Sequence, residues 1–204
     1  MMNLAISLVL FFLAVIIHEY SHGWVAWKLG DSTAKMAGRL TLNPAAHIDP
    51  IGTILLPLIL LVTHSPVLFG WAKPVPVDFQ SLHNPKKDMV WVSLAGPGAN
   101  ILLAVILSFI LKLAGAAGNP LFVAVTSSAI IINLVLAIFN ILPIPPLDGS
   151  RVVMGLLPIE LSVKYARIEP YGLVIIFGLL YLGLIGNFIW PLVTLMARFL
   201  GVSI

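Results

Sequence analysis

The sequence predicts an all-α polytopic membrane protein, with a three-helix core, further C-terminal helices and a small β-sheet at the membrane surface. Of its 204 residues, 60% are hydrophobic and only 9% are charged, and the mean hydropathy is +1.07. A typical soluble domain is about one quarter charged. Residues 1–204 are therefore expected to form one integral-membrane domain, in contact with the lipid bilayer.

The composition also limits the available chemistry. The chain has no cysteine, so a metal would have to be bound by histidine, aspartate or glutamate. The net charge of +3 and the pI near 9.3 do not indicate a nucleic-acid partner, because the basic residues follow the membrane topology described below. The sequence makes no prediction of the oligomeric state.

Three long apolar segments are predicted to be the core helices. They are Leu4–Val25, Val90–Leu111 and Leu121–Leu142. Each holds roughly the 20 residues that a helix needs to cross the hydrocarbon core. Inside a bilayer the backbone must satisfy its own hydrogen bonds, which favours helices over irregular chain.

The C-terminal apolar stretch, Tyr171–Leu200, is expected to be helical but interrupted. Gly186, Asn187 and Pro191 lie within it, and such residues bend or break a helix. The stretch is either two short helices, which would return Arg198 to the cytoplasmic side, or one long kinked helix.

A fifth apolar run, Ile51–Phe69, contains Pro57 and Pro66 and is either a span or a re-entrant segment. Cytoplasmic loops collect lysine and arginine. If the run does not cross the membrane, nine basic residues outside the core helices share one side, and Lys112 lies on the other. The charge pattern therefore favours a re-entrant segment. The nine residues are Lys28, Lys35, Arg39, Lys73, Lys86, Lys87, Arg151, Lys164 and Arg167.

Between the first and second core helices the hydrophobic pattern changes. Lys35–Leu42 places its apolar residues at alternating positions, a period typical of a strand. Trp71–Asp78 contains Pro74 and Pro76, which confine such a run to a sheet edge or an extended segment. These two segments predict the membrane-surface sheet.

Residues 18–22 read His-Glu-Tyr-Ser-His and lie near the end of the first core helix. Positions i and i+4 share a helix face, so His18 and His22 can reach one metal ion. Glu19 lies beside them, where it could take a proton from water. The alternative is a histidine pair that only packs between helices. Ionisable residues inside a span are costly and usually functional, which favours a metal site.

A zinc site with two histidines needs a third protein ligand, and Asp148 is the candidate. It follows the proline-rich run 143–146, which cannot continue a helix. A solvated cytoplasmic turn is the alternative interpretation. Asp148 can lie at the same membrane depth as His18 and His22 if Ile51–Phe69 does not cross the membrane. This condition agrees with the charge pattern.

Three asparagines and a further histidine have less specific interpretations. Asn140 could stabilise an oxyanion or hold substrate backbone, and this role is favoured over helix packing. Asn133 and Asn100 are interpreted as helix packing. His47 is an extra metal ligand, a residue that orients a ligand, or part of a surface turn.

Together these residues resemble the site-2 protease family of intramembrane metalloproteases, peptidase family M50. Four motifs carry the resemblance, in the family's order, and the late Leu-Asp-Gly makes the set far more specific than the first motif alone. They are His18-Glu19-Tyr-Ser-His22, Asn43-Pro44-Ala-Ala-His47, Gly96-Pro97-Gly-Ala-Asn100 and Asn140-Ile-Leu-Pro-Ile-Pro-Pro-Leu-Asp148-Gly149.

The resemblance implies a zinc metalloprotease of the small prokaryotic type, without PDZ or cystathionine-β-synthase domains. One zinc ion would be bound by His18, His22 and Asp148, with Glu19 as general base. The site would face the cytoplasm of a multi-pass cell-membrane protein. The implied activity is cleavage of transmembrane protein substrates in regulated intramembrane proteolysis.

A transmembrane substrate hides its carbonyl groups in helical hydrogen bonds, so it must unwind locally before cleavage. Trp71–Asp78 could hold the unwound segment by β-addition, in contact with Val75 and Val77. The main alternative function is a transition-metal or proton transporter, which also uses intramembrane histidine and aspartate. A transporter would usually show repeated halves, and no repeat is visible. An inactive membrane scaffold is the second alternative, and the intact Glu19 argues against it.

Overall fold

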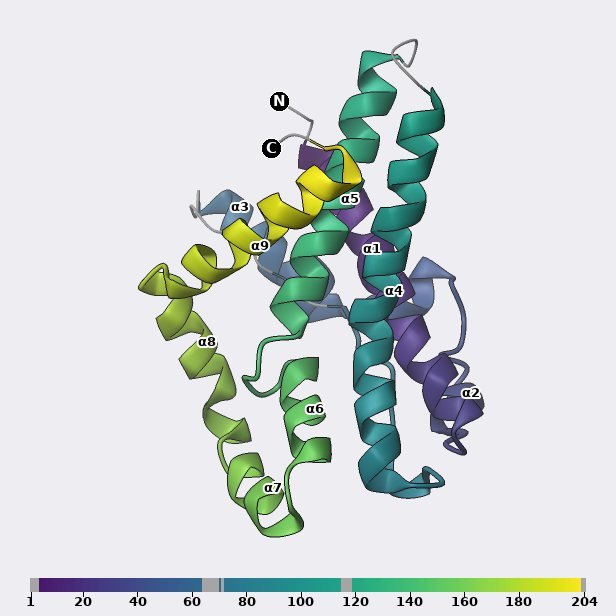
Figure 1. The fold of residues 1–204 in the computed structure, drawn as a ribbon, viewed down its shortest axis with the longest axis vertical. Coiled ribbons are helices and arrows are strands. Elements are labelled where there is room, and N and C mark those ends of the chain that lie inside the picture. Colours follow the sequence, from purple (N-terminus) through teal and green to yellow (C-terminus); the bar gives the residue numbers. More distant parts are fainter. Residues whose placement is uncertain (1–3, 64–69, 71, 115–118, 203–204) are drawn as a thin grey trace.

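The computed structural model describes residues 4–63, 70, 72–114 and 119–202, and the regular elements in these ranges are all helical (Figure 1). The long helices are α1 (Leu4–Lys28), α4 (Pro85–Ala114) and α5 (Pro120–Asn140). The shorter ones are α2 (Thr33–Met36), α3 (Leu56–Val62), α6 (Asp148–Leu156), α7 (Ile159–Ala166), α8 (Gly172–Tyr181) and α9 (Leu184–Leu200). Further 3-10 or π-helical turns lie at Pro44–His47, Pro50–Leu55, Phe79–Ser81 and Glu169–Tyr171.

The three long helices are the candidate membrane spans, as the sequence predicts. Each is long and apolar enough to cross a bilayer. α4 packs against both α1 and α5, and α1 also packs against α5 (Figure 1). A buried cluster that includes Ala104, Leu134 and Val193 joins α4, α5 and α9. Because lipid tails are as apolar as these side chains, close packing and buried polar contacts have to hold the helices together.

The C-terminal stretch forms two helices, α8 and α9, with a bend of 75° at the break between them. The bent pair is long and apolar enough to form one broken span. The break lies at Gly183, whose φ of +71° is a left-handed conformation that glycine adopts without strain. Gly186, Asn187 and Pro191, the breakers that the sequence indicated, lie inside α9.

The carboxyl end of α9 lies beside the carboxyl end of α4. Ser108 Oγ donates a hydrogen bond of 2.6 Å to Leu200 O. Arg198 therefore lies at the Lys112 end of α4, whereas α6 packs near the other end, where Lys86 Nζ donates to Leu157 O. The expectation that two helices would return Arg198 to the other basic residues is therefore wrong, because α9 turns at the break and crosses toward α5 and the Lys112 end of α4 (Figure 1).

Only part of the predicted re-entrant segment belongs to the described residues. Pro50–Leu55 and α3 form a short apolar helix, which Asp49 caps by accepting hydrogen bonds from Ile51 N and Gly52 N. Residues 64–69 lie outside the described residues. The re-entrant path of 51–69 therefore stays a prediction.

The predicted membrane-surface β-sheet is wrong, because the described residues contain no β-strand. In Lys35–Leu42, Arg39 N donates to Ala34 O over a turn in which Gly38 has a φ of +65°. The alternation of apolar residues there reflects a turn after α2 rather than a pleated strand.

Residues 72–78, here called the strap, are extended but are fastened mainly by side chains instead of a neighbouring strand. Pro74 and Pro76 have no N–H and so cannot contribute to a regular ladder. Trp71, which the sequence analysis included in this segment, lies outside the described residues. The hydrogen bonds are Lys73 N to His47 O (2.9 Å), Arg39 Nη2 to Lys73 O (2.7 Å) and Pro74 O (3.3 Å), Val75 N to Glu19 Oε2 (2.8 Å), and Asp78 N to Asp31 Oδ2 (2.8 Å).

Replacement of Asp31 should destabilise the fold. Its carboxylate is fully buried and accepts hydrogen bonds from Thr33 N and Asp78 N, each of 2.8 Å. Asp31→Ala leaves both amides without this acceptor, so we expect the free energy of unfolding to fall by about 2 kcal/mol or more, measured by reversible denaturation in detergent. Asp49→Ala is the control, since this more exposed helix cap should lose only about 1 kcal/mol. Equal losses in the two variants would contradict the burial argument.

Candidate metal centre

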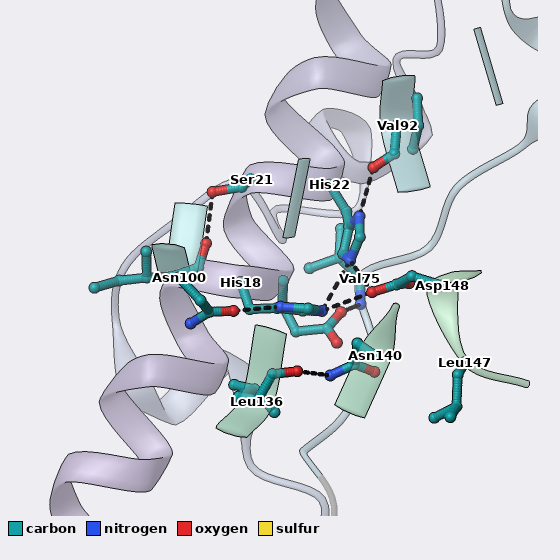
Figure 2. Close-up of polar contacts among 12 residues, drawn as sticks. His18, Ser21, His22, Val75, Val92, Asn100, Leu136, Asn140, Leu147 and Asp148 are labelled. Carbon is teal, nitrogen blue, oxygen red and sulfur yellow. Dashed lines mark hydrogen bonds and ion pairs between the residues drawn. The ribbon is translucent and has the colours of Figure 1, made fainter. Parts of the chain in front are cut away.

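The first two candidate ligands lie on α1. His18 and His22 are one helical turn apart, on the face that packs against α4. Both side chains are buried, with 5% and 8% of their surface exposed. Their Nε2 atoms point toward each other at 3.0 Å (Figure 2).

The third candidate ligand, Asp148, is the first residue of α6. A tight turn brings it there, and Gly149 permits that turn because a Cβ at this position would overlap the backbone carbonyl of Ile141. Asp148 Oδ2 lies 3.0 Å from His18 Nε2 and 3.2 Å from His22 Nε2. The structure therefore brings together the three residues that the sequence suggested as ligands.

The spacing of these three atoms fits a tetrahedral zinc ion. Zinc bonds to nitrogen and oxygen of about 2.0–2.1 Å separate neighbouring ligand atoms by about 3.3 Å in a tetrahedron. The observed separations are 3.0, 3.0 and 3.2 Å. The donor set, two imidazole nitrogens and a carboxylate oxygen, is also one that zinc accepts.

The protonation of the histidines supports the same conclusion. His22 Nδ1 lies 2.7 Å from the carbonyl of Val92, and His18 Nδ1 lies 2.6 Å from Asn100 Oδ1. Both oxygens only accept hydrogen bonds, so both Nδ1 atoms carry the proton in the neutral rings. Two Nε2 lone pairs and a carboxylate oxygen then converge at one point, an arrangement that a cation stabilises.

Asp148 is ionised in this environment. Burial raises the pKa of its carboxyl group, but when no metal is bound a proton on the histidine Nε2 atoms gives hydrogen bonds and charge interactions with His18 and His22 that outweigh burial and lower the pKa to about 2. The carboxylate is therefore in the form that binds metal at neutral pH.

Glu19 faces the same site from α1. Its Oε2 accepts the hydrogen bond from Val75 N in the strap, and the Val75 side chain is buried. The strap and the start of α6 line a cleft of about 300 Å³ that also contains the three candidate ligands and Glu19. The three candidate ligands and Glu19 are therefore accessible from this cleft.

The other predicted site residues lie at different places. Asn140 and Val77 line the cleft. Asn140 Nδ2 donates a hydrogen bond of 2.9 Å to Leu136 O within its own helix (Figure 2). His47 lies apart from the three ligands, and its Nε2 donates a hydrogen bond of 2.8 Å to Thr41 O. Its side chain is fully buried, although it ends the 3-10 turn Pro44–His47, in which Pro44 and Ala45 are exposed.

Sequence reasoning assigned Asn100 to helix packing, but Asn100 and Gly96 both lie against the histidines. Asn100 bonds His18, and a Cβ on Gly96 would lie 2.6 Å from His18 Nε2 and closer still to His22 Nε2. The two residues are four positions apart and so share a face of α4. Their spacing was visible in the sequence, but which helix they face was not.

Comparisons with known proteins agree with this geometry. Residues 110–183 match the family described as Peptidase family M50. A Bacillus subtilis (strain 168) protein provisionally named zinc metalloprotease YwhC is 43% identical over 183 residues, covering 86% of this chain and 80% of the relative. Rip2 of Mycolicibacterium smegmatis, also provisionally named a zinc metalloprotease, is 28% identical over 191 residues, covering 94% of this chain and 72% of the relative. Zinc metalloprotease MJ0392 of Methanocaldococcus jannaschii is 24% identical over 167 residues, covering 81% of this chain and 37% of the relative. No solved structure gives a significant match.

Gly96→Ala should disrupt metal binding, because the added methyl group overlaps both imidazole rings. We expect the zinc affinity of the purified protein, measured by chelator competition, to fall by about 100-fold. Gly98→Ala in the same motif is the matched control, since its Cβ would meet no atom within 4 Å. Unchanged zinc affinity in Gly96→Ala would contradict this view of the site.

Proposed function

Because this chain belongs to peptidase family M50 and is a zinc metalloprotease, we propose that it cleaves membrane-protein substrates within or near their transmembrane segments. The position of the site carries the proposal. His18, Glu19 and His22 lie on α1, which is apolar and long enough to span a membrane. A peptide bond has to reach that depth to be cut, and transmembrane segments are the chains that lie there. Regulated intramembrane proteolysis is the process that such cleavage would serve.

His18, His22 and Asp148 would hold one zinc ion. When bound, the ion supplies Lewis-acid chemistry for peptide hydrolysis. Its ligands enter from two elements, with the histidines on α1 and the aspartate on α6. Binding zinc would therefore also tie the first core helix to the turn that follows α5.

Glu19 would act as the general base and later as the acid. Its carboxylate takes a proton from the attacking water and passes that proton to the leaving amine. The hydrogen bond from Val75 N holds Oε2 and so orients the other carboxylate oxygen. Asn140, which lines the cleft, would stabilise the oxyanion after its Nδ2 turns away from Leu136 O.

The strap would form one wall of the substrate site. A transmembrane helix must unwind before its carbonyl groups are accessible, and the unwound segment would lie against Val75 and Val77. Lys73 N, Val75 N and Asp78 N already donate to groups of this chain. Contact through side chains and carbonyl groups is therefore favoured over full strand pairing.

The site would face the cytoplasm of a prokaryotic cell, in its cell membrane. Lys86 and Arg151 lie on α4 and α6 at the end of the molecule that holds α7, and Lys112 lies at the opposite end of α4 (Figure 1). Basic residues are enriched on the cytoplasmic side of membrane proteins. The relatives come from Bacillus subtilis, Mycolicibacterium smegmatis and Methanocaldococcus jannaschii, which are prokaryotes.

Glu19→Gln tests the proposed function directly. The change removes the base and keeps the shape, so we expect kcat for cleavage of a transmembrane reporter in lipid vesicles to fall by at least about 100-fold. Zinc affinity should stay the same, because Glu19 is not among the three converging ligands.

Glu160→Gln is the control for this experiment, since Glu160 is an exposed carboxylate on α7. It should cleave the reporter like the wild type, and a chelator should stop cleavage by both. A Glu19→Gln variant that cleaves normally while it holds zinc would refute the mechanism. Metal uptake into the vesicles without any cleavage would point instead to the transporter alternative.

A further inference from the structure

We propose that Asn133 is a positioning residue for the metal centre: acting through Asn100, it selects the tautomer of His18 whose Nε2 lone pair faces the ion. The inference rests on the proposed function in one respect only, which is that His18 is a ligand of the zinc ion. The chain of contacts crosses three helices, from His18 on α1 to Asn100 on α4 and Asn133 on α5. Figure 2 shows its first step, between His18 and Asn100.

Backbone carbonyl groups set the direction of every hydrogen bond in this chain of contacts. Asn133 Nδ2 donates a hydrogen bond of 2.8 Å to Ala129 O, which leaves Asn133 Oδ1 as an acceptor. Asn100 Nδ2 donates one hydrogen bond of 2.8 Å to that oxygen and one of 3.2 Å to Ala14 O. Asn100 therefore presents Oδ1 to His18 Nδ1, at 2.6 Å. Because an amide oxygen only accepts, Nδ1 carries the proton.

Burial removes the other arrangements. Asn100 is 0% exposed and Asn133 is 2% exposed, so bulk water cannot complete a missing hydrogen bond. If the Asn100 amide were flipped, its oxygen would face Ala14 O and Asn133 Oδ1, and neither of these can donate. Its NH₂ group would also face His18 Nδ1 and favour the proton on Nε2, where it blocks metal binding.

His22 has no such dependence on side chains. Its Nδ1 lies 2.7 Å from the backbone carbonyl of Val92, a group that remains whatever side chain stands there. His18 is the ligand whose tautomer depends on amides from two other helices. Asn133 acts on it only through Asn100, since its own side-chain hydrogen bonds go to Asn100 and Ala129.

The test compares the zinc affinity of the full chain, measured by chelator competition, with the thermal stability of the metal-free protein. Asn133→Leu removes the nearer of the two acceptors that orient Asn100 and leaves only the longer bond to Ala14 O, so the Kd for zinc should rise about 10–100-fold. Asn133→Asp keeps that acceptor, and its protonated form still donates to Ala129 O, so its Kd should stay within about threefold of the wild-type value.

Ser108→Ala is the matched control. It removes another buried side-chain hydrogen bond of α4, the one to Leu200 O, and should lower stability without changing the Kd for zinc. The inference is overturned if Asn133→Leu binds zinc like the wild type, or if Asn133→Leu, Asn133→Asp and Ser108→Ala all weaken binding alike. His22→Ala separates this inference from the proposed function, because unchanged zinc affinity in that variant would refute the ligand assignment itself.

Discussion

The convergence of His18 Nε2, His22 Nε2 and Asp148 Oδ2 is the constraint on which the rest of the structure depends. Three atoms with lone pairs lie within 3.2 Å of each other, although their residues come from the first core helix and from the turn after the third. Such an arrangement requires α1 and α6 to meet at one depth. α4 packs against both and provides a face without a side chain, at Gly96, where the imidazole rings lie.

Burial between the helices explains why so many polar groups stand behind the ligands. A polar group in a low-dielectric environment is destabilising unless it is paired. Here the pairing ends on backbone carbonyl groups, at Val92 for His22 and at Ala14 and Ala129 for the chain behind His18. Carbonyl groups accept and never donate, so they give the whole network one direction. The same bonds that satisfy burial also set the chemistry of the ligands.

Local features were predictable from the sequence, and features that depend on helix crossings were not. The spacing of His18 and His22 on one helix, the apolar length of α1 and the proline-rich turn before Asp148 are properties of neighbouring residues. The partner of Asn100 depends on how α4 crosses α1, which no local pattern contains. The sheet prediction failed for a related reason: an extended segment resembles a strand whether its amides bond to another strand or, as at Val75, to a side chain.

The strap has a consequence for how the cleft can open. A strand within a sheet moves only when its neighbours move, but the strap is attached at separate points on Arg39, Asp31 and Glu19. One of these attachments is the carboxylate proposed to carry the proton. Protonation of Glu19 weakens its bond to Val75 N, because a neutral acid is a poorer acceptor than a carboxylate. Each turnover would therefore loosen this attachment of the strap when Glu19 takes the proton and restore it when the proton passes to the leaving amine.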